Sequence, residues 1–350
     1  MPIGPSRTPP NPSENTTNPQ VLWRIDHSRC LLYTAAPIAA GGCCVSAPSQ
    51  PQGSDMNHPQ TAIGLLLITA LASTAQAGIR RHDRDDALYQ DLANESQFQS
   101  VARLQIIGPN GPRTCSGTLI NSEWILTAAH CFDGIETPNA AALLGGAFGI
   151  ASEIIIHPGW SEGQVTQGAD LALIRLSVPI THITAATIFN GSNEIGLMGT
   201  GVGYGRSGTG NTGEIPGTLG TKRAGTNMID ALGSDRGFHE SILLTDFDNP
   251  NRESDSTYGS PIPTDLEYQV AGGDSGGSLF IQENGQYYLA GVTSFINSIN
   301  GPADGDYGDM SAYTRLSDYN AWVNSVIPAP SGLAVLSIGI FGVSRRRRSV

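Results

Sequence analysis

Short apolar runs separated by glycine, proline, asparagine and aspartate fill residues 98–327 of the chain. The runs CSGTLI and WILTAA have the composition of strands on either side of Asn121-Ser122, and LALIRL is apolar throughout except at Arg175. The segment SLFIQENGQYYLAGVTSF surrounds Asn284-Gly285, a pair favoured at hairpin turns. Many short strands without intervening helices predict an all-β fold, either a sandwich or a barrel.

The pattern changes at the end of this region. Between Ser317 and Ile327 the apolar and aromatic side chains recur at helical spacing. They are Tyr319, Trp322, Val323 and Val326. Because Ser317 stands where an N-cap residue would, we expect one short C-terminal helix beginning there.

Residues 56–77, MNHPQTAIGLLLITALASTAQA, have the layout of a secretory signal peptide. A polar start leads into an apolar run, and Ala75-Gln76-Ala77 forms a small-residue cleavage site; a buried core helix is the alternative. Because a signal peptide begins its chain, Met56 is the expected start. Residues 1–55, rich in Pro, Ser, Asn and Thr, are then a gene-model extension or a disordered leader. Residues 78–97 would form the N-terminal segment of the exported protein.

The tail, residues 328–350, combines Pro328-Ala329-Pro330, a short apolar run and the cluster Arg345–Arg348. The run is shorter than the ~20 residues that span a bilayer, and the arginines favour a cytoplasmic C-terminus. The tail resembles a PEP-CTERM sorting signal, although Ala329 replaces the usual Glu. This resemblance implies a Gram-negative bacterium, export through the inner membrane to the cell surface or beyond, and transient membrane contact through the tail. The implied partners are signal peptidase and an exosortase-like sorting protease; the alternative is an anchor that is never cut.

Charge narrows the range of functions. The net charge is -12, yet three arginines and three acids precede residue 78, and four more arginines lie in the tail. Between residues 78 and 344 this leaves 12 Lys and Arg against 28 Asp and Glu, a balance of -16. A body this acidic is repelled by nucleic acid and by anionic lipid, so nucleic-acid binding is excluded.

The cysteines fit an exported protein. Of the five, Cys30, Cys43 and Cys44 precede the predicted mature start, which leaves Cys115 and Cys131. An even pair in an exported chain is typical of a disulfide. Two free thiols, the alternative, would suit a cytosolic protein.

Three segments carry groups suited to peptide hydrolysis, which needs a nucleophile, a base and donors for the developing oxyanion. The sequence Gly272-Gly273-Asp274-Ser275-Gly276-Gly277-Ser278 surrounds a serine with glycines, which allow a tight turn with clustered backbone N–H groups. TAAHC contains His130, a base able to activate a serine hydroxyl. Asp170 opens the apolar strand DLALI, where a carboxylate is costly unless it is paired.

Together, TAAHC, DLALIRL and GGDSGGSL resemble the trypsin/chymotrypsin family in content and order, over roughly residues 98–327. The resemblance implies two packed six-stranded antiparallel β-barrels with the cleft between them. It implies that Ser275 attacks the scissile carbonyl, that His130 acts as base and then acid, and that Asp170 orients His130. The N–H groups of Gly273 and Ser275 would form the oxyanion hole. No cofactor and no metal are implied.

Further structural roles follow from the same resemblance. Asp274 would be the partner of a buried amine, and a disulfide between Cys115 and Cys131 would lie beside the catalytic histidine. In this family the amine is the free N-terminus of the mature chain, and its pairing with the acid activates the enzyme. The usual N-terminal sequence, Ile-Val-Gly-Gly, does not precede TAAHC at the usual distance here, so two routes to a free N-terminus are open. The amine of Gly78 could insert directly after signal cleavage, or a second cut could follow Arg81.

The specificity pocket departs from the family pattern. Its floor, six residues before the nucleophile, is the neutral Gln269, and Ala271 replaces a cysteine that usually closes the wall. The wall strand reads Ser294-Phe295-Ile296, and Ser311 replaces a common glycine. We therefore expect a neutral pocket that prefers uncharged residues, unless an acid from the pocket wall, such as Glu267 or Asp309, reaches in and restores a basic preference.

The leading hypothesis is a secreted serine endopeptidase that works through an acyl-enzyme. One alternative is a catalytically silent, protease-like binding module displayed at the cell surface; another is a surface protein whose function resides in its anchor. A separate acidic stretch could in principle hold Ca²⁺, but without EF-hand spacing we assign it to a solvated loop. Its members are Asp246, Asp248, Asp255 and Asp265.

Overall fold

The computed structural model describes residues 78–109, 111–136 and 139–327. The predictions for residues 1–55, 56–77 and 328–350 therefore lie outside the described residues. The described part begins with β1 (Gly78–Arg80), so the whole of the predicted N-terminal segment, residues 78–97, is included.

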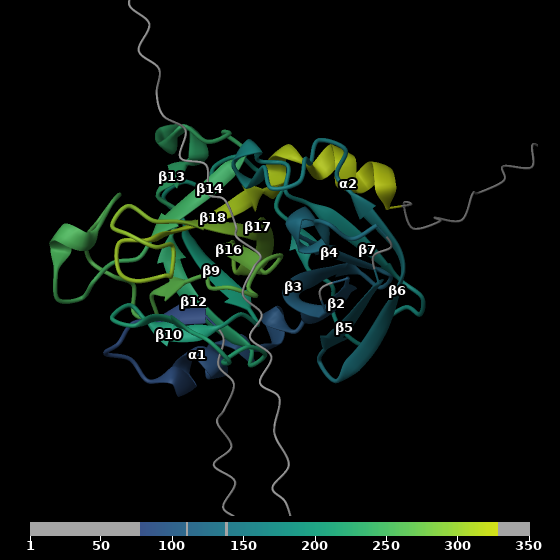
Figure 1. Ribbon diagram of the computed structural model, residues 1–350, viewed down its shortest axis with the longest axis horizontal. Helices are drawn as coiled ribbons and strands as arrows, with labels where there is room; N and C mark the ends of the chain where they lie inside the picture. The colour runs from purple at the N-terminus through teal and green to yellow at the C-terminus, as the bar shows by residue number, and fades with distance from the viewer. Residues whose placement is uncertain (1–77, 110, 137–138, 328–350) are drawn as a thin grey trace, which may run out of the picture. The chain divides into compact units, whose positions relative to one another are not determined.

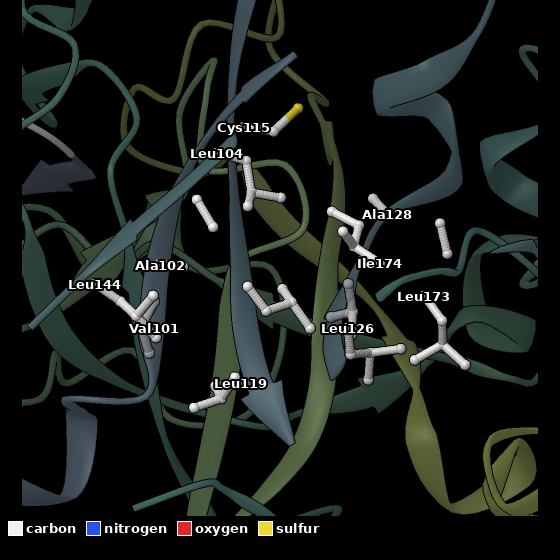
Figure 2. Packing of buried hydrophobic residues seen from close by; sticks show 14 of the residues in the cluster. Val101, Ala102, Leu104, Cys115, Leu119, Leu126, Ala128, Leu144, Leu173 and Ile174 are labelled. Atoms are coloured by element: carbon white, nitrogen blue, oxygen red, sulfur yellow. The ribbon is translucent and has the colours of Figure 1, made fainter. Parts of the chain in front are cut away.

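A closed barrel of six antiparallel strands forms the first half of the described chain (Figure 1). In barrel order its strands are β2 (Val101–Gly108), β3 (Gly111–Asn121), β4 (Trp124–Thr127), β7 (Ala172–Leu176), β6 (Ala147–Ile156) and β5 (Asn139–Leu144). The predicted strand runs lie in β3, β4 and β7. Figure 2 shows the barrel core, in which Leu104, Leu119 and Leu126 are fully buried. Arg175, the exception in its apolar run, points to solvent and pairs with Glu123. The predicted first barrel is confirmed.

The second half is built on a larger antiparallel sheet. Its strands run in the order β12 (Arg223–Met228), β9 (Met198–Gly203), β16 (Ser278–Glu283), β17 (Gln286–Asn297), β18 (Met310–Arg315), β14 (Ile242–Asp246) and β13 (Ala231–Leu232), and β8 (Thr187–Ile188) pairs with β17. The sheet curls enough for Asn227 in β12 to donate a side-chain hydrogen bond to the carbonyl of Asp246 in β14. Backbone pairing does not close it, so the second barrel is a half-barrel. The predicted hairpin is confirmed: Asn284 and Gly285 both have positive φ, +51° and +80°, at the β16–β17 turn.

A small third sheet contains the start of the described chain. Its order is β11 (Gly213–Ile215), β10 (Ser207–Thr209), β1 and β15 (Tyr268–Gln269). Within β1, Ile79 is fully buried and pairs with Gly208 on one side and with Gln269 on the other. The first residues of the predicted mature protein are thus an integral strand of the fold.

The helices are short, and two expectations about them need correction. Helix α1 (Asp86–Ala93) was not predicted; it is held by the fully buried Arg223, whose Nε donates to Asp86 Oδ1 at 2.6 Å. The C-terminal helix α2 runs only from Asn320 to Val326, and Tyr319 occupies its N-cap position. Ser317 does not cap it, because its hydroxyl donates to Glu194 at 2.8 Å. The 3₁₀ turns are η1 (Ser96–Phe98), η2 (Ala129–Phe132), η3 (Val165–Gln167), η4 (Gly233–Arg236), η5 (Glu253–Asp255) and η6 (Leu316–Asp318). None of the helices in the described ranges is long and apolar enough to span a bilayer.

The predicted disulfide is confirmed. Cys115 in β3 is bonded to Cys131 in η2, and the two residues are 16 positions apart in the sequence. Closing a loop of this length stabilises a fold by about 3 kcal/mol, chiefly by restricting the unfolded chain. Because His130 adjoins Cys131, the bond also fixes the turn that carries this histidine.

We expect replacement of both cysteines, Cys115→Ser with Cys131→Ser, to lower the unfolding free energy by about 3 kcal/mol. For a domain of this size that is a fall in Tm of about 6–12 °C. Thermal unfolding of both proteins, with and without a reductant, measures the effect. The reductant should lower the Tm of the parent and leave the double variant unchanged, and an unaltered Tm in the double variant would contradict the assigned role.

Candidate active site

Ser275, His130 and Asp170, which lie far apart in the sequence, form one hydrogen-bonded line. Ser275 Oγ is 2.8 Å from His130 Nε2, and His130 Nδ1 is 2.6 Å from Asp170 Oδ2. His130 comes from η2, Asp170 from the residue pair before β7, and Ser275 from the turn before β16. The line therefore crosses from the first barrel to the second half of the fold.

Asp170 is fully buried, and its carboxylate is held by several donors. Oδ1 accepts the backbone N–H of His130 at 2.9 Å, and Oδ2 accepts the hydroxyl of Ser294 at 2.5 Å in addition to the imidazole. Thr314 in β18 donates to the Asp170 carbonyl at 3.4 Å. Because these donors come from separate elements, the carboxylate has one orientation, and that orientation fixes the imidazole.

The imidazole of His130 is poised to accept a proton. Burial disfavours its charged form, but the hydrogen bond and the negative charge of Asp170 outweigh this effect and raise the pKa of His130 above its ordinary value. Its side chain keeps 23% of its surface exposed, so part of the ring is accessible to solvent.

Glycines are required where the chain turns around Ser275. Gly276 has φ +79°, and a Cβ there would lie 2.0 Å from Thr127 Oγ1, so no other residue fits. The carbonyl of Ser275 accepts the N–H of Ser116 at 2.8 Å, which ties the turn to the first barrel. Within the described ranges, the N–H groups of Gly273 and Ser275 donate to no other group. Both are therefore available for a substrate oxygen.

Asp274, beside Ser275, is buried and receives three neutral donors. Its carboxylate accepts the N–H of Gly205 at 2.7 Å, the N–H of Ala271 at 3.0 Å and the hydroxyl of Tyr268 at 3.1 Å. Burial outweighs these bonds and raises the pKa of Asp274 to about 6. The amine expected from the family resemblance is not among the three donors.

A cavity of about 280 Å³ opens beside Ser275. It is lined by Glu214, Val270, Ala271, Gly272, Ser275, Thr293, Ser294, Phe295, Ile296 and Ala303. The predicted wall residues Ser294, Phe295 and Ile296 belong to this lining. Gln269 and Ser311 lie outside it: both are fully buried, and the Ser311 hydroxyl donates to Gln269 Oε1 at 2.5 Å.

A polar clamp holds Gly272 at the cavity mouth. The N–H of Gly272 donates to Glu214 Oε2 at 2.7 Å, and its carbonyl accepts the N–H of Arg206 at 2.8 Å. Glu214 and Arg206 also form an ion pair with each other. Because Gly272 directly precedes Gly273, the clamp fixes the peptide that leads into the turn around Ser275.

Several residues of the site were missed by sequence reasoning. Ser294 was assigned to the pocket, without its bond to Asp170, and neither Tyr268 nor the Arg206–Glu214 pair was singled out. No local motif marks them, because each acts on a residue distant in the sequence or across a strand. The assignment of the acidic stretch to a solvated loop was wrong for Asp246 and Asp248, which are 2% and 5% exposed. Asp265 is exposed, as expected.

The sequence of the chain matches a known protein family and several known proteins. The family described as Trypsin matches residues 90–323. Chymotrypsin-like elastase family member 1 of Felis catus is 29% identical over 265 residues, which are 67% of this chain and 87% of the relative. The protein of the same name in Bos taurus is 30% identical over 242 residues, 63% of this chain and 81% of the relative. A solved structure of neuropsin, a serine protease expressed in the limbic system of mouse brain, is 21% identical with a TM-score of 0.49 and covers 67% of this chain and 96% of its own. Because the family match covers about two thirds of its length, the chain belongs to the trypsin family of serine endopeptidases.

Proposed function

We propose that the protein is a secreted endopeptidase in which Ser275 is the nucleophile, His130 the general base and Asp170 the residue that orients it. The observation that carries the proposal is the unbroken hydrogen-bonded line from Ser275 Oγ to Asp170, next to a cavity that Ser275 itself lines. A silent binding module would not need this geometry.

The mechanism follows from the contacts. As Ser275 Oγ attacks the scissile carbonyl carbon, its proton passes to His130 Nε2, and the carbonyl π electrons move onto oxygen. The imidazolium that forms is stabilised by Asp170, and the oxyanion is met by the N–H groups of Gly273 and Ser275. His130 then returns the proton to the leaving amine as the C–N bond breaks, which leaves an acyl-enzyme. Water repeats the sequence to release the acid.

Ser275→Ala should abolish peptide hydrolysis, with a fall in kcat of about 10⁶-fold. Because the serine hydroxyl lies in the line and not in the core, the variant should fold with an unchanged Tm. Ser152→Ala, on the exposed face of β6, is the matched control and should retain full activity. Titration with a serine-reactive phosphonate should label the parent and the control but not Ser275→Ala. Activity of Ser275→Ala within tenfold of the parent would refute the assignment.

The rising limb of kcat/KM against pH should have its midpoint above ~6.5, the ordinary histidine pKa. The sign follows from the raised pKa of His130, since the base must be neutral and stays protonated to a higher pH than an isolated histidine. Asp170→Asn removes the charge that raises this pKa, so the midpoint should move down while kcat falls about 10⁴-fold. A parent midpoint at or below ~6.5 would contradict the described electrostatics.

We further propose that the cavity accepts uncharged side chains. Val270, Phe295 and Ile296 supply apolar surface. Among the described residues that line the cavity only Glu214 is charged, and it is already neutralised by Arg206. The acids considered as possible basic-preference determinants, Glu267 and Asp309, do not line it. A substrate Lys or Arg would enter without a free carboxylate to pair with, a loss of typically several kcal/mol.

A panel of peptides varied only at the residue before the cut should show cleavage of Leu, Phe, Ala and Gln at least tenfold faster than Lys and Arg. Glu214→Gln, which keeps an acceptor for Gly272 but removes the charge, should leave this ratio within a few fold. A hundredfold preference for Lys and Arg in the parent would overturn the neutral-pocket proposal. If the parent showed that preference and Glu214→Gln lost it, the Glu214 carboxylate would be its cause.

Signal cleavage after Ala77 is proposed to create the working N-terminus. Gly78 has φ +67° and is buried with its Cα so close to Tyr268 that a Cβ would lie 2.1 Å from the ring. The hydroxyl of the same ring donates to Asp274. An amine freed at Gly78 would therefore lie near a buried carboxylate that otherwise has only neutral donors. The alternative cut after Arg81 would delete β1 and with it the buried Ile79.

The secreted protein should begin with Gly78-Ile79-Arg80-Arg81, and expression from Met56 should give the same product as expression from Met1. N-terminal sequencing and mass spectrometry test both points. Gly78→Ala should reduce activity and stability, because it combines an unfavourable φ, about 1–3 kcal/mol, with the overlap on Tyr268. Gly146→Ala is the matched control, since its φ is +80° but open space surrounds it. A mature chain that starts at His82, or peptides from residues 1–55 in secreted material, would refute the scheme.

The predicted tail suggests a fate after export. We propose that residues 328–350 hold the protein at the inner membrane until an exosortase-like protease removes them, which leaves the enzyme at the surface or free. Signal peptidase and this sorting protease would then be its processing partners, and extracellular proteins or peptides its substrates.

A further inference from the structure

Three aspartates converge in the connection between β17 and β18. Asp304, Asp306 and Asp309 each bring a carboxylate oxygen within 4.8 Å of those of the other two. Within the described ranges, no salt bridge involves any of the three. The connection thus gathers negative charge without a protein cation to balance it.

Burial makes the arrangement unusual. Asp309 is fully buried; its Oδ2 accepts the N–H of Gly305 at 2.9 Å, but its Oδ1 has no hydrogen-bond partner in the described part of the chain. Oδ1 of Asp304 is likewise a buried atom without a partner there. A buried acceptor left without a donor destabilises the fold, and more so when it carries charge. Two such oxygens beside a third carboxylate therefore call for a ligand from solution.

We propose that Asp304, Asp306 and Asp309 bind a calcium ion. Carboxylate oxygens are hard donors of the kind that Ca²⁺ and Mg²⁺ take. Spacings of two and three residues within one short loop resemble the way calcium loops draw ligands from alternate positions, and Ca²⁺ tolerates irregular sets of six to eight oxygens. Mg²⁺ requires near-ideal octahedral geometry and dehydrates reluctantly, so it should bind more weakly here.

The loop that would bind the ion contacts the cavity wall and β1. Ala303 lines the cavity beside Ser275, and the carbonyl of Asp304 accepts the N–H of Glu214 at 2.7 Å. Gly305 lies against Ile79, where a Cβ would be only 2.0 Å from Cδ1. An ion that orders this loop would therefore also order the cavity wall, the Gly272 clamp and β1. This coupling to activity rests on the proposed function, whereas the binding itself does not.

Binding should be measured on the full secreted chain with Ser275→Ala, which prevents self-digestion. Isothermal titration with CaCl₂ is expected to give one site with a Kd of about 0.1–1 mM, the range of extracellular modules. In 10 mM CaCl₂ the Tm should be roughly 3–10 °C higher than in EDTA. MgCl₂ at the same concentration should give less than half that shift.

Two variants locate the site. Asp306→Asn keeps an acceptor for Asn300, which donates to Asp306 Oδ1 at 3.0 Å, but removes one charge; the calcium Kd should weaken about tenfold or more. Asp309→Asn should abolish the calcium shift and raise the Tm in EDTA, because it relieves the buried repulsion. Asp91→Asn, on the exposed face of α1, is the control and should respond to calcium like the parent.

The outcomes separate this proposal from the proposed function. No calcium-dependent shift in the parent, or a shift that persists in both Asp306→Asn and Asp309→Asn, would overturn the site whether or not Ser275 is catalytic. In chains that retain Ser275, calcium should raise kcat/KM at least twofold for the parent and not for Asp309→Asn. A calcium response confined to Tm would reject the coupling to the cavity wall.

Discussion

The buried carboxylate of Asp170 is the constraint on which the site depends. It lies two residues before β7 of the first barrel, yet it accepts hydrogen bonds from His130 in η2 and from Ser294 in β17 of the second half. A charge without exposed surface must be surrounded by donors, and these donors come from both halves of the fold. Correct packing of the two halves is therefore also the condition for the correct orientation of His130.

Local motifs made the centre of the site predictable. TAAHC, DLALIRL and GGDSGGSL each join a functional side chain to an obligatory local structure: a turn, a buried strand, or a turn that only glycine can make. Gly276 illustrates this, because a side chain there would collide with Thr127. The same alternation of short apolar runs and turn residues predicted an all-β fold and the hairpin at Asn284, whereas the six-stranded barrel was implied by the resemblance to the trypsin/chymotrypsin family.

Features formed by distant partners could not be predicted in the same way. Helix α1 depends on an ion pair between Asp86 and Arg223, which no local pattern reveals. Ser317 has the appearance of an N-cap, but Glu194 offers its hydroxyl a stronger acceptor, and the helix starts later. The Gly272 clamp likewise needs Glu214, which the hairpin of β10 and β11 brings across the cavity mouth. In each case tertiary pairing outweighs the local preference.

Buried acids in this acidic protein are accommodated in different ways. Glu194 pairs with Arg315, whose Nη2 is 2.7 Å from Oε2. Burial, reinforced by neighbouring acids, raises the pKa of Asp230 and of Glu267 to about 8, which favours their protonated forms at neutral pH. Asp309 is fully buried, its Oδ1 has no hydrogen-bond partner in the described part of the chain, and two more aspartates adjoin it. That contrast with the arginine-paired Glu194 is why a cation from solution is the physical complement of this loop.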